Sequence, residues 1–312
     1  MGLAIITVLL LIQDQIEKKM TQDAAGIDLV VGAKGSPLQL ILSSVYHIDF
    51  PTGNIPLEEA KKLTRNRLVK SIIPLALGDN YQGHRIIGTN HDYIKLYKSE
   101  LSGGNLWKYP FEVVIGAEIA QKTGLKIGDK FEGSHGISVG SHGHEEHDFQ
   151  VVGILKSSGN VLDRLILTSI ESVWYTHDEA VAEDSEEHET ESHQPKVDLF
   201  HAEVALSGFP ETDSSRELTS LLIGYRNPMA AIQLPRQINS GTSMQAASPS
   251  FEMLRLFELL GLGVSLLQGL AIVLIGISGL GIFIALYNSL KERKYDLAIL
   301  RTIGASRVQL LF

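Results

Sequence analysis

Cysteine is absent from the 312 residues of the chain. This excludes disulfide bonds, thiolate metal ligands and cysteine nucleophiles, although both cytosolic and envelope proteins lack cysteine often enough that the compartment stays open. Positive charge is also scarce, with 27 Lys and Arg against 36 Asp and Glu, and the net charge is -9. Because nucleic-acid phosphates are bound by clustered cationic side chains, we expect no nucleic-acid partner.

Nucleotide-binding and hydrolytic motifs are missing as well. The sequence has no G-x-x-x-x-G-K-[ST] loop, and neither G-x-S-x-G nor H-E-x-x-H occurs. Gly32-Ala-Lys-Gly35 is rich in glycine but lacks the phosphate-loop spacing, so a strand-to-helix turn is the better interpretation. We therefore expect a non-catalytic chain that does not hydrolyse ATP itself; scattered His and Asp are all that favours an envelope enzyme.

Charge is missing from one long stretch, Leu259 to Leu290. A membrane-spanning helix needs about 20 apolar residues, and this stretch is long enough, which favours a span over a buried core helix. Basic residues follow it: Lys291, Arg293, Lys294, Arg301 and Arg307. The positive-inside rule places that end in the cytoplasm and residues 13–258 outside the cytoplasm.

The first twelve residues, Met1 to Ile12, are also apolar but too few to span a membrane alone. One interpretation is a signal-peptide core; the other is the outer part of a truncated first transmembrane helix. A basic leader and a nearby small-residue cleavage site are both missing, which favours the second. Residues 13–22 are polar helix formers and predict a helical stalk.

Short strands and short helices are mixed in the region between. Glycine and proline signals mark several ends: Ser36-Pro37 begins a helix, and Gly124 closes one that starts at Ala117. The expected strands are 28–32, 71–77, 85–89, 113–116, 149–155, 165–168, 201–206 and 232–234. The expected helices are 38–45, 117–123, 170–175 and 214–225. This mixture predicts an α+β domain.

Three segments resemble FtsX-like, MacB-type ABC transporter permeases. Val113 to Lys130 is similar to a segment in which a strand and a short helix precede a "GLKVGD"-like turn, and Phe149 to Leu155 resembles a strand of the family's second subdomain. Lys291 to Ser306 resembles the cytoplasmic motif R-x-x-E-x-x-x-L-R-A-L-G-A. Asp296 stands where the family usually has Glu, and Thr302 where Ala is common.

The resemblance implies the fold and the domain organisation. We expect an α+β extracytoplasmic domain with porter and sabre-like subdomains, the MacB-type periplasmic core, flanked by transmembrane α-helices. The expected parts are a truncated first transmembrane helix (1–12), a stalk (13–22), the core domain (23–250, with a second subdomain inserted at about 111–196), a stalk with a transmembrane helix (251–290), and an ATPase-facing cytoplasmic segment that begins the next helix (291–312).

The resemblance also implies a function. It suggests the permease subunit of an ABC transporter in the bacterial cytoplasmic (inner) membrane, which works in export or lipoprotein release; the histidine stretches described next would add divalent-metal-linked transport. The implied partners are an ABC-type ATPase, a second permease copy in a dimer, the lipid bilayer and a periplasmic protein. The residues that would face the ATPase are Lys291, Arg293, Tyr295, Asp296, Leu300, Arg301 and Gly304.

Histidine is concentrated in two stretches. His142, His144 and His147 lie within six residues beside carboxylates, and His188 and His193 lie in a strongly acidic stretch. Imidazole with carboxylate suits zinc or another divalent metal, so these five residues are candidate ligands. Solvated loops without a metal function are the other interpretation. If the metal site is real, an alternative function is a membrane-anchored metal-binding or sensing protein without an ATPase.

Overall fold

The computed structural model describes residues 2–133, 148–176, 204–211 and 215–304. The chain divides into two units. The helical unit is formed by Met1–Glu17 and Leu256–Phe312, and the core domain by Lys18–Arg255.

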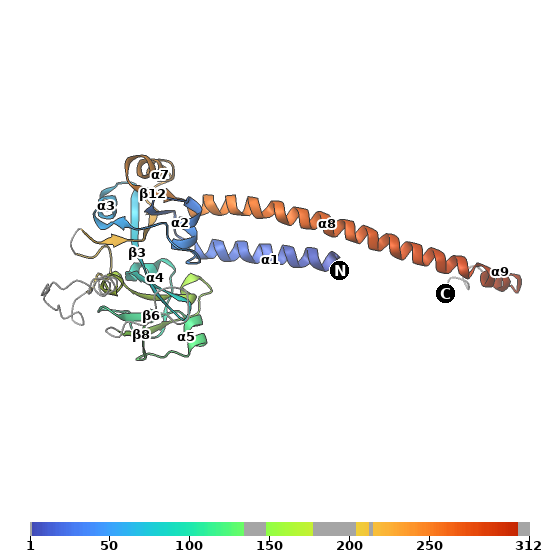
Figure 1. The fold of residues 1–312 in the computed structure, drawn as a ribbon, viewed down its shortest axis with the longest axis horizontal. Coiled ribbons are helices and arrows are strands. Elements are labelled where there is room, and N and C mark those ends of the chain that lie inside the picture. Colours follow the sequence, from blue (N-terminus) through green and yellow to red (C-terminus); the bar gives the residue numbers. More distant parts are fainter. Residues whose placement is uncertain (1, 134–147, 177–203, 212–214, 305–312) are drawn as a thin grey trace, which may run out of the picture. The chain divides into compact units, whose positions relative to one another are not determined.

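A large mixed β-sheet forms the centre of the core domain (Figure 1). The order of its strands is β12-β1-β11-β3-β4-β9-β6-β8-β5, with β7 beside β8. Their bounds are β1 (Leu29–Ala33), β3 (Val69–Tyr81), β4 (His84–Thr89), β5 (Leu101–Gly104), β6 (Glu112–Ile115), β7 (Lys130–Phe131), β8 (Phe149–Leu155), β9 (Ile166–Ser169), β11 (Ser220–Tyr225) and β12 (Met244–Ala247). A separate pair consists of β2 (Ile55–Pro56) and β10 (Glu217–Leu218).

The long strand β3 belongs to both halves of this sheet. Its residues up to Leu75 pair with β11, and those from Ala76 onward pair with β4. We call β12, β1, β11 and the start of β3 the first half, and the end of β3 with β4 to β9 the second half. Strand β4 pairs in parallel with β9, so residues 84–104 share hydrogen-bonded strands with the stretch expected at 111–196. One continuous sheet therefore connects the two expected subdomains.

Short helices cover the sheet, and their ends follow local signals. Ser36 caps α2 (Pro37–Ser44) by accepting a hydrogen bond from the Gln39 amide at 3.4 Å, and α5 (Ala117–Thr123) ends at Gly124, whose φ of 77° suits glycine. Helices α2 and α7 pack against β12, and α5 packs against β8. The remaining elements are α3 (Leu57–Lys62), α4 (His91–Leu96), α7 (Ala230–Gly241), a helix over residues 170–176, and the 3-10 turns η1 (Leu63–Arg65) and η2 (Val161–Arg164).

Two clusters of buried apolar side chains stabilise the core domain. The second half has its own cluster around Phe111, Val113, Phe149 and Val151. The cluster of the first half includes Leu29, Val31, Leu221 and Leu234. It also includes Ile170, Val173 and Trp174, which follow β9 of the second half in the chain. The helix at 170–176 thus contributes to the core of the first half and ties the halves together by burial.

Most expected elements are confirmed, and three are not. The strand expected at 201–206 lies partly outside the described residues, and its described residues 204–206 form no strand. Residues 214–225 were expected to be helical, but those from Glu217 onward form β10 and β11. Strand β11 is buried between β1 and β3, so tertiary pairing outweighs helix propensity there. Residues 232–234 are expected to be extended but lie in α7, a helix that contains Pro235. Leu234 and Ile238 lie one turn apart on this helix, and both are buried.

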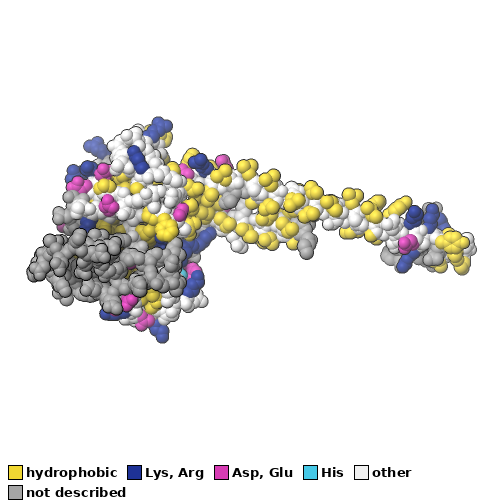
Figure 2. All heavy atoms as spheres, viewed as in Figure 1, with side chains coloured by type: hydrophobic (Ala, Val, Ile, Leu, Met, Phe, Trp, Pro, Cys, Tyr) yellow, Lys and Arg dark blue, Asp and Glu magenta, His cyan; other side chains and the backbone are white. Residues whose placement is uncertain are grey.

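The helical unit contains most of α1 (Gly2–Asp23) and of α8 (Pro249–Glu292), followed by α9 (Lys294–Thr302). In the described part of the chain, α8 is the one helix that is long and apolar enough to cross a membrane. Its large apolar side chains, such as Leu266 and Phe283, are exposed, and Figure 2 shows hydrophobic side chains along its visible face. This surface suits contact with lipid rather than with water.

Candidate functional site

The candidate metal ligands lie outside the described residues. This applies to His142, His144, His147, His188 and His193. Within the described ranges, no group of three or more His, Asp or Glu could hold a metal ion. The metal site therefore stays a prediction from the sequence.

The expected ATPase-facing residues lie at the end of α8 and on α9. Lys291 is in the last turn of α8, Arg293 joins the two helices, and Arg301 is in the last turn of α9. The apolar Tyr295, Ile299 and Ile303 follow at intervals of four residues and are all exposed; residues so spaced share one face of a helix. The others expected there are Asp296 and Leu300 on α9, and Gly304 just after it with a φ of 104°. Their approach to an ATPase stays a prediction.

The C-terminal end of α1 makes a dense set of polar contacts inside the core domain. The Asp23 carboxylate is 1% exposed and accepts a hydrogen bond of 2.8 Å from the Arg164 guanidinium. Lys19 Nζ lies 3.4 Å from the other carboxylate oxygen. Two hydroxyl groups donate to carbonyls of the last turn, that of Tyr46 to Met20 and that of Tyr97 to Asp23. The Met20 carbonyl also accepts a hydrogen bond from the Ala24 amide at 3.1 Å. The Asp23 carbonyl lies at the very end of the helix, so Tyr97 acts as its side-chain cap.

A tight turn over residues 157–164 faces this helix end. Within it, the Asp163 carboxylate accepts hydrogen bonds from the amides of Ser158 and Gly159, at 3.0 and 2.7 Å, and from the hydroxyls of Ser157 and Ser158. The carbonyls of the same turn face α1: Lys19 donates to Gly159, and Gln22 donates to Ser158 at 3.3 Å. The turn is thus fixed by its own carboxylate and presents acceptors to the helix.

Buried ionisable groups lie next to this contact. The imidazole of His47 lies 3.0 Å from the Tyr93 hydroxyl. Burial, reinforced by the nearby charges of Arg164 and Arg85, lowers the pKa of His47 to about 3, so the ring is neutral. Burial also raises the pKa of Tyr46 and Tyr93, with a smaller contribution from the Asp23 charge. The ion pair between Asp23 and Arg164 therefore lies beside the neutral side chains of His47, Tyr46 and Tyr93.

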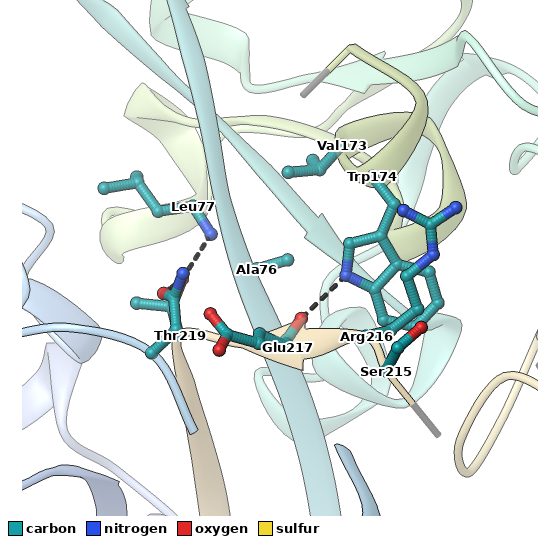
Figure 3. A pocket seen from close by; sticks show the side chains of 9 residues that line it. Ala76, Leu77, Val173, Trp174, Ser215, Arg216, Glu217 and Thr219 are labelled. Carbon is teal, nitrogen blue, oxygen red and sulfur yellow. Dashed lines mark hydrogen bonds between the residues drawn. The ribbon is translucent and has the colours of Figure 1, made fainter. Parts of the chain in front are cut away.

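A hollow of about 300 Å³ opens where β3 passes from the first half to the second (Figure 3). Leu77 and Trp174 line it, and in Figure 3 the Trp174 indole points toward Glu217. A neighbouring hollow of about 430 Å³ shares Trp174 and Arg216 with it and is also lined by Glu171. Burial raises the pKa of Glu171, whose Oε1 accepts a hydrogen bond from the Ala205 amide at 2.8 Å.

Sequence reasoning missed the contact between α1 and the turn. Asp23 and Arg164 are 141 positions apart, and neither lies in a recognisable motif. The turn itself could have been found, because Ser158-Gly159-Asn160 is a turn signal. Its partner could not, since no local pattern indicates which helix a turn contacts.

Comparison with solved structures finds distant similarities. The periplasmic region of MacB from Actinobacillus actinomycetemcomitans is 12% identical, with 76% of this chain and 97% of that one covered and a TM-score of 0.45. The extracellular domain of the noncanonic ABC-type transporter YknZ from Gram-positive bacteria is 13% identical, with 71% and 99% covered and a TM-score of 0.38. A domain of a permease-type protein from Porphyromonas gingivalis is 10% identical, with 72% and 89% covered and a TM-score of 0.32. At these scores, the similarities carry no argument about function. No curated protein matches the chain.

The match to a protein family is more extensive. The model of the MacB-like periplasmic core domain matches residues 1–206, about two thirds of the chain. It covers α1, the strands β1 to β9 and the turn that contacts Asp23. The resemblance inferred from the sequence is thereby confirmed, and the chain belongs to the family of ABC-transporter-type permeases with a MacB-like periplasmic core domain.

Proposed function

We propose that this chain is the permease subunit that converts ATP hydrolysis by a partner ATPase into movement of its core domain outside the cytoplasmic membrane. One observation carries the proposal. The chain that matches the family model passes from β12, the last strand of the core domain, into the single helix α8, which ends two residues before α9 begins. No extended segment interrupts α8, so a displacement of one end of the helix would be transmitted to its other end.

The dimensions of α8 fit this role. Its 44 residues correspond to about 66 Å at 1.5 Å per residue, whereas the hydrocarbon core of a bilayer is about 30 Å thick. The helix is therefore long enough to cross the membrane and to extend beyond it. Its charge-free part is followed by Lys291 and Arg293, which favour the cytoplasmic side.

The α9 segment has the chemistry of a protein-docking helix. It combines exposed Tyr295, Ile299 and Ile303 with the cationic Arg301. Aromatic, aliphatic and arginine side chains are the groups that contribute most to protein interfaces. In this proposal α9 contacts the ATPase, two permease copies form the transporter, and the chain has no catalytic activity of its own. The candidate processes are export, lipoprotein release and divalent-metal-linked transport.

The experiment compares two charge reversals on the same short helix. Arg301→Glu changes a residue of the family-like motif, and Lys294→Glu changes an exposed position that the motif leaves variable. The full-length transporter is purified from membranes with its ATPase, and both ATPase retention and the rate of ATP hydrolysis are measured. We expect loss of both in Arg301→Glu and retention in Lys294→Glu. Full retention in Arg301→Glu and in Gly304→Pro would remove this segment from the mechanism.

A further inference from the structure

The end of α1 is attached to the core domain in two different ways. In the chain, α1 continues through residues 24–28 into β1, which lies in the first half of the sheet. In space, its last two turns contact the turn at 157–164, which connects β8 and β9 of the second half. The helix is therefore joined covalently to one half and non-covalently to the other.

The non-covalent attachment uses three consecutive interactions. We call it the α1 clamp: Lys19, Gln22 and Asp23 on the helix, with Gly159, Ser158 and Arg164 on the turn. Lys19 and Gln22 donate to backbone carbonyls, and Asp23 accepts from a guanidinium. The helix thus supplies two donors and one acceptor to complementary groups of the turn, which fixes the register of the helix against the turn.

The clamp combines a rigid turn with an ion pair whose carboxylate is buried. Asp163 holds the turn through hydrogen bonds to two amides and two hydroxyls, so the turn cannot bend without breaking several of them. The Asp23 side chain is 1% exposed, whereas that of Arg164 is 32% exposed. Removal of the guanidinium would leave a buried carboxylate with Lys19 as its one remaining, more distant cationic neighbour. Separation of the ion pair therefore costs free energy.

From this geometry we infer that the α1 clamp transmits movement of α1 to the second half of the sheet, and that Asp23 and Arg164 are the positioning residues of this transmission. The inference rests on the proposed function, in which ATP hydrolysis moves the core domain. Without the clamp, α1 would act on the second half only through the strand order β1-β11-β3-β4 and through the single hydrogen bond from Tyr97 to the Asp23 carbonyl. With it, one helix acts on both halves at once.

The test measures movement of the second half of the sheet relative to the membrane. Because the chain has no cysteine, a single Gln121→Cys on the exposed side of α5 accepts a fluorescent donor, and acceptor-labelled lipids are placed in nanodiscs containing the complete transporter with its ATPase. Energy transfer is compared in ATP and in ADP. We expect an ATP-dependent change in the otherwise unmodified chain, and its loss in Asp23→Asn and Arg164→Gln while ATP hydrolysis continues.

The matched control removes an ion pair of the same half that does not contact α1. Glu100 and Lys156 form an exposed pair at 2.6 Å, so Glu100→Gln should keep the ATP-dependent change. Thermal unfolding followed by tryptophan fluorescence shows whether each variant is folded. Lys19→Ala, at a more exposed position of the clamp, should reduce the change and provides the comparison if Asp23→Asn does not fold.

The outcomes separate the two ideas. If the chain with the clamp intact shows no ATP-dependent change, the proposed function fails, and the inference fails with it. If that change is present and persists in full in the folded Asp23→Asn, Arg164→Gln or Lys19→Ala variants, only the inference is overturned. Equal losses in the clamp variants and in Glu100→Gln would also overturn it, since any disturbance of the second half would then suffice.

Discussion

The indole Nε1 of Trp174 donates a hydrogen bond of 2.7 Å to the backbone carbonyl of Glu217. Trp174 follows β9 of the second half, whereas Glu217 lies on β10, which pairs with β2. The Arg216 guanidinium lies 5.7 Å from the centre of the Trp174 ring. A single aromatic side chain thus connects the second half to the β2–β10 pair, beside the strand that both halves share.

Trp174→Phe should lower the free energy of unfolding of the core domain by about 1 kcal/mol, because it removes the hydrogen bond and leaves the Glu217 carbonyl without this donor. Denaturant unfolding of the full chain in detergent measures the change, with Trp107 as the remaining fluorophore. Trp107→Phe is the control, since the Trp107 Nε1 has no hydrogen-bond partner among the described residues. An unchanged free energy of unfolding in Trp174→Phe would contradict the role of the hydrogen bond.

His47→Asn should make the core domain less sensitive to acid. The pKa of His47 is about 3 in the folded state, below its ordinary value of 6.5. Between these values the unfolded chain binds the proton and the folded chain does not, so stability falls as pH falls, by at most about 1.4 kcal/mol per pH unit. Asn does not titrate and tolerates the φ of 54° at this position.

The measurement is the free energy of unfolding at several pH values from 7 downward to about 4, a range set by the titration of imidazole. Other groups titrate in both proteins, so the difference between the two slopes is the relevant quantity. Identical slopes would mean that the pKa of His47 is not lowered in the folded state.

Glu171→Gln should stabilise the folded state at neutral pH. Burial raises the pKa of Glu171, and its Oε2 has no hydrogen-bond partner in the described structure. A carboxyl group with a raised pKa costs stability as pH rises through its titration, because the folded state must then hold a buried charge. Gln retains an acceptor for the Ala205 amide. Unfolding experiments at pH values on both sides of the carboxyl titration should show a gain that is confined to the higher pH; a loss at neutral pH would refute the prediction.

Single cysteines test the orientation in the membrane. Gln121→Cys lies on the core domain and Thr302→Cys at the end of α9, and both positions are exposed. In intact cells an impermeant thiol reagent should label the first and not the second, because basic residues follow the charge-free stretch of α8. Permeabilised cells provide the control for reactivity. The reverse pattern would invert the proposed topology.

Zinc binding tests the histidine clusters. If His142, His144 and His147 form a site, titration of the full chain with zinc should show binding in the micromolar range at best, about -8 kcal/mol, which weakens as imidazole protonates below neutral pH. The control variant carries Ala at all three positions. Equal heats from the two proteins would leave the metal-linked function without support.

Elements with a local signal were predictable from the sequence. The Ser36-Pro37 start of α2, the Gly124 end of α5 and the alternating burial of β8 all follow from residue chemistry within a few positions. Strand β11 and helix α7 were not, because their conformation depends on partners far away in the chain: β11 pairs with β1 and β3, and α7 packs against β12.

The candidate sites divide in the same way. The segment from Lys291 to Gly304 could be identified because its family-like motif is contiguous. The α1 clamp could not, because Asp23 meets Arg164 across 141 positions, and a lone Asp at the end of a polar helix has many possible partners. Only the fold shows that the two side chains meet and that the carboxylate is buried.

The strand order has a consequence for biosynthesis. Strand β1 is made early, yet both of its neighbours come late: β11 at Ser220–Tyr225 and β12 at Met244–Ala247. Pairing between segments so distant in the chain is slow, and unpaired strand edges are prone to aggregation. The first half of the sheet is therefore incomplete until residue 247 has been synthesised, two residues before α8 begins. In the proposed topology, insertion of α8 into the bilayer and closure of the sheet are nearly simultaneous events, and chaperones must shield the unpaired edges of β1 until that moment.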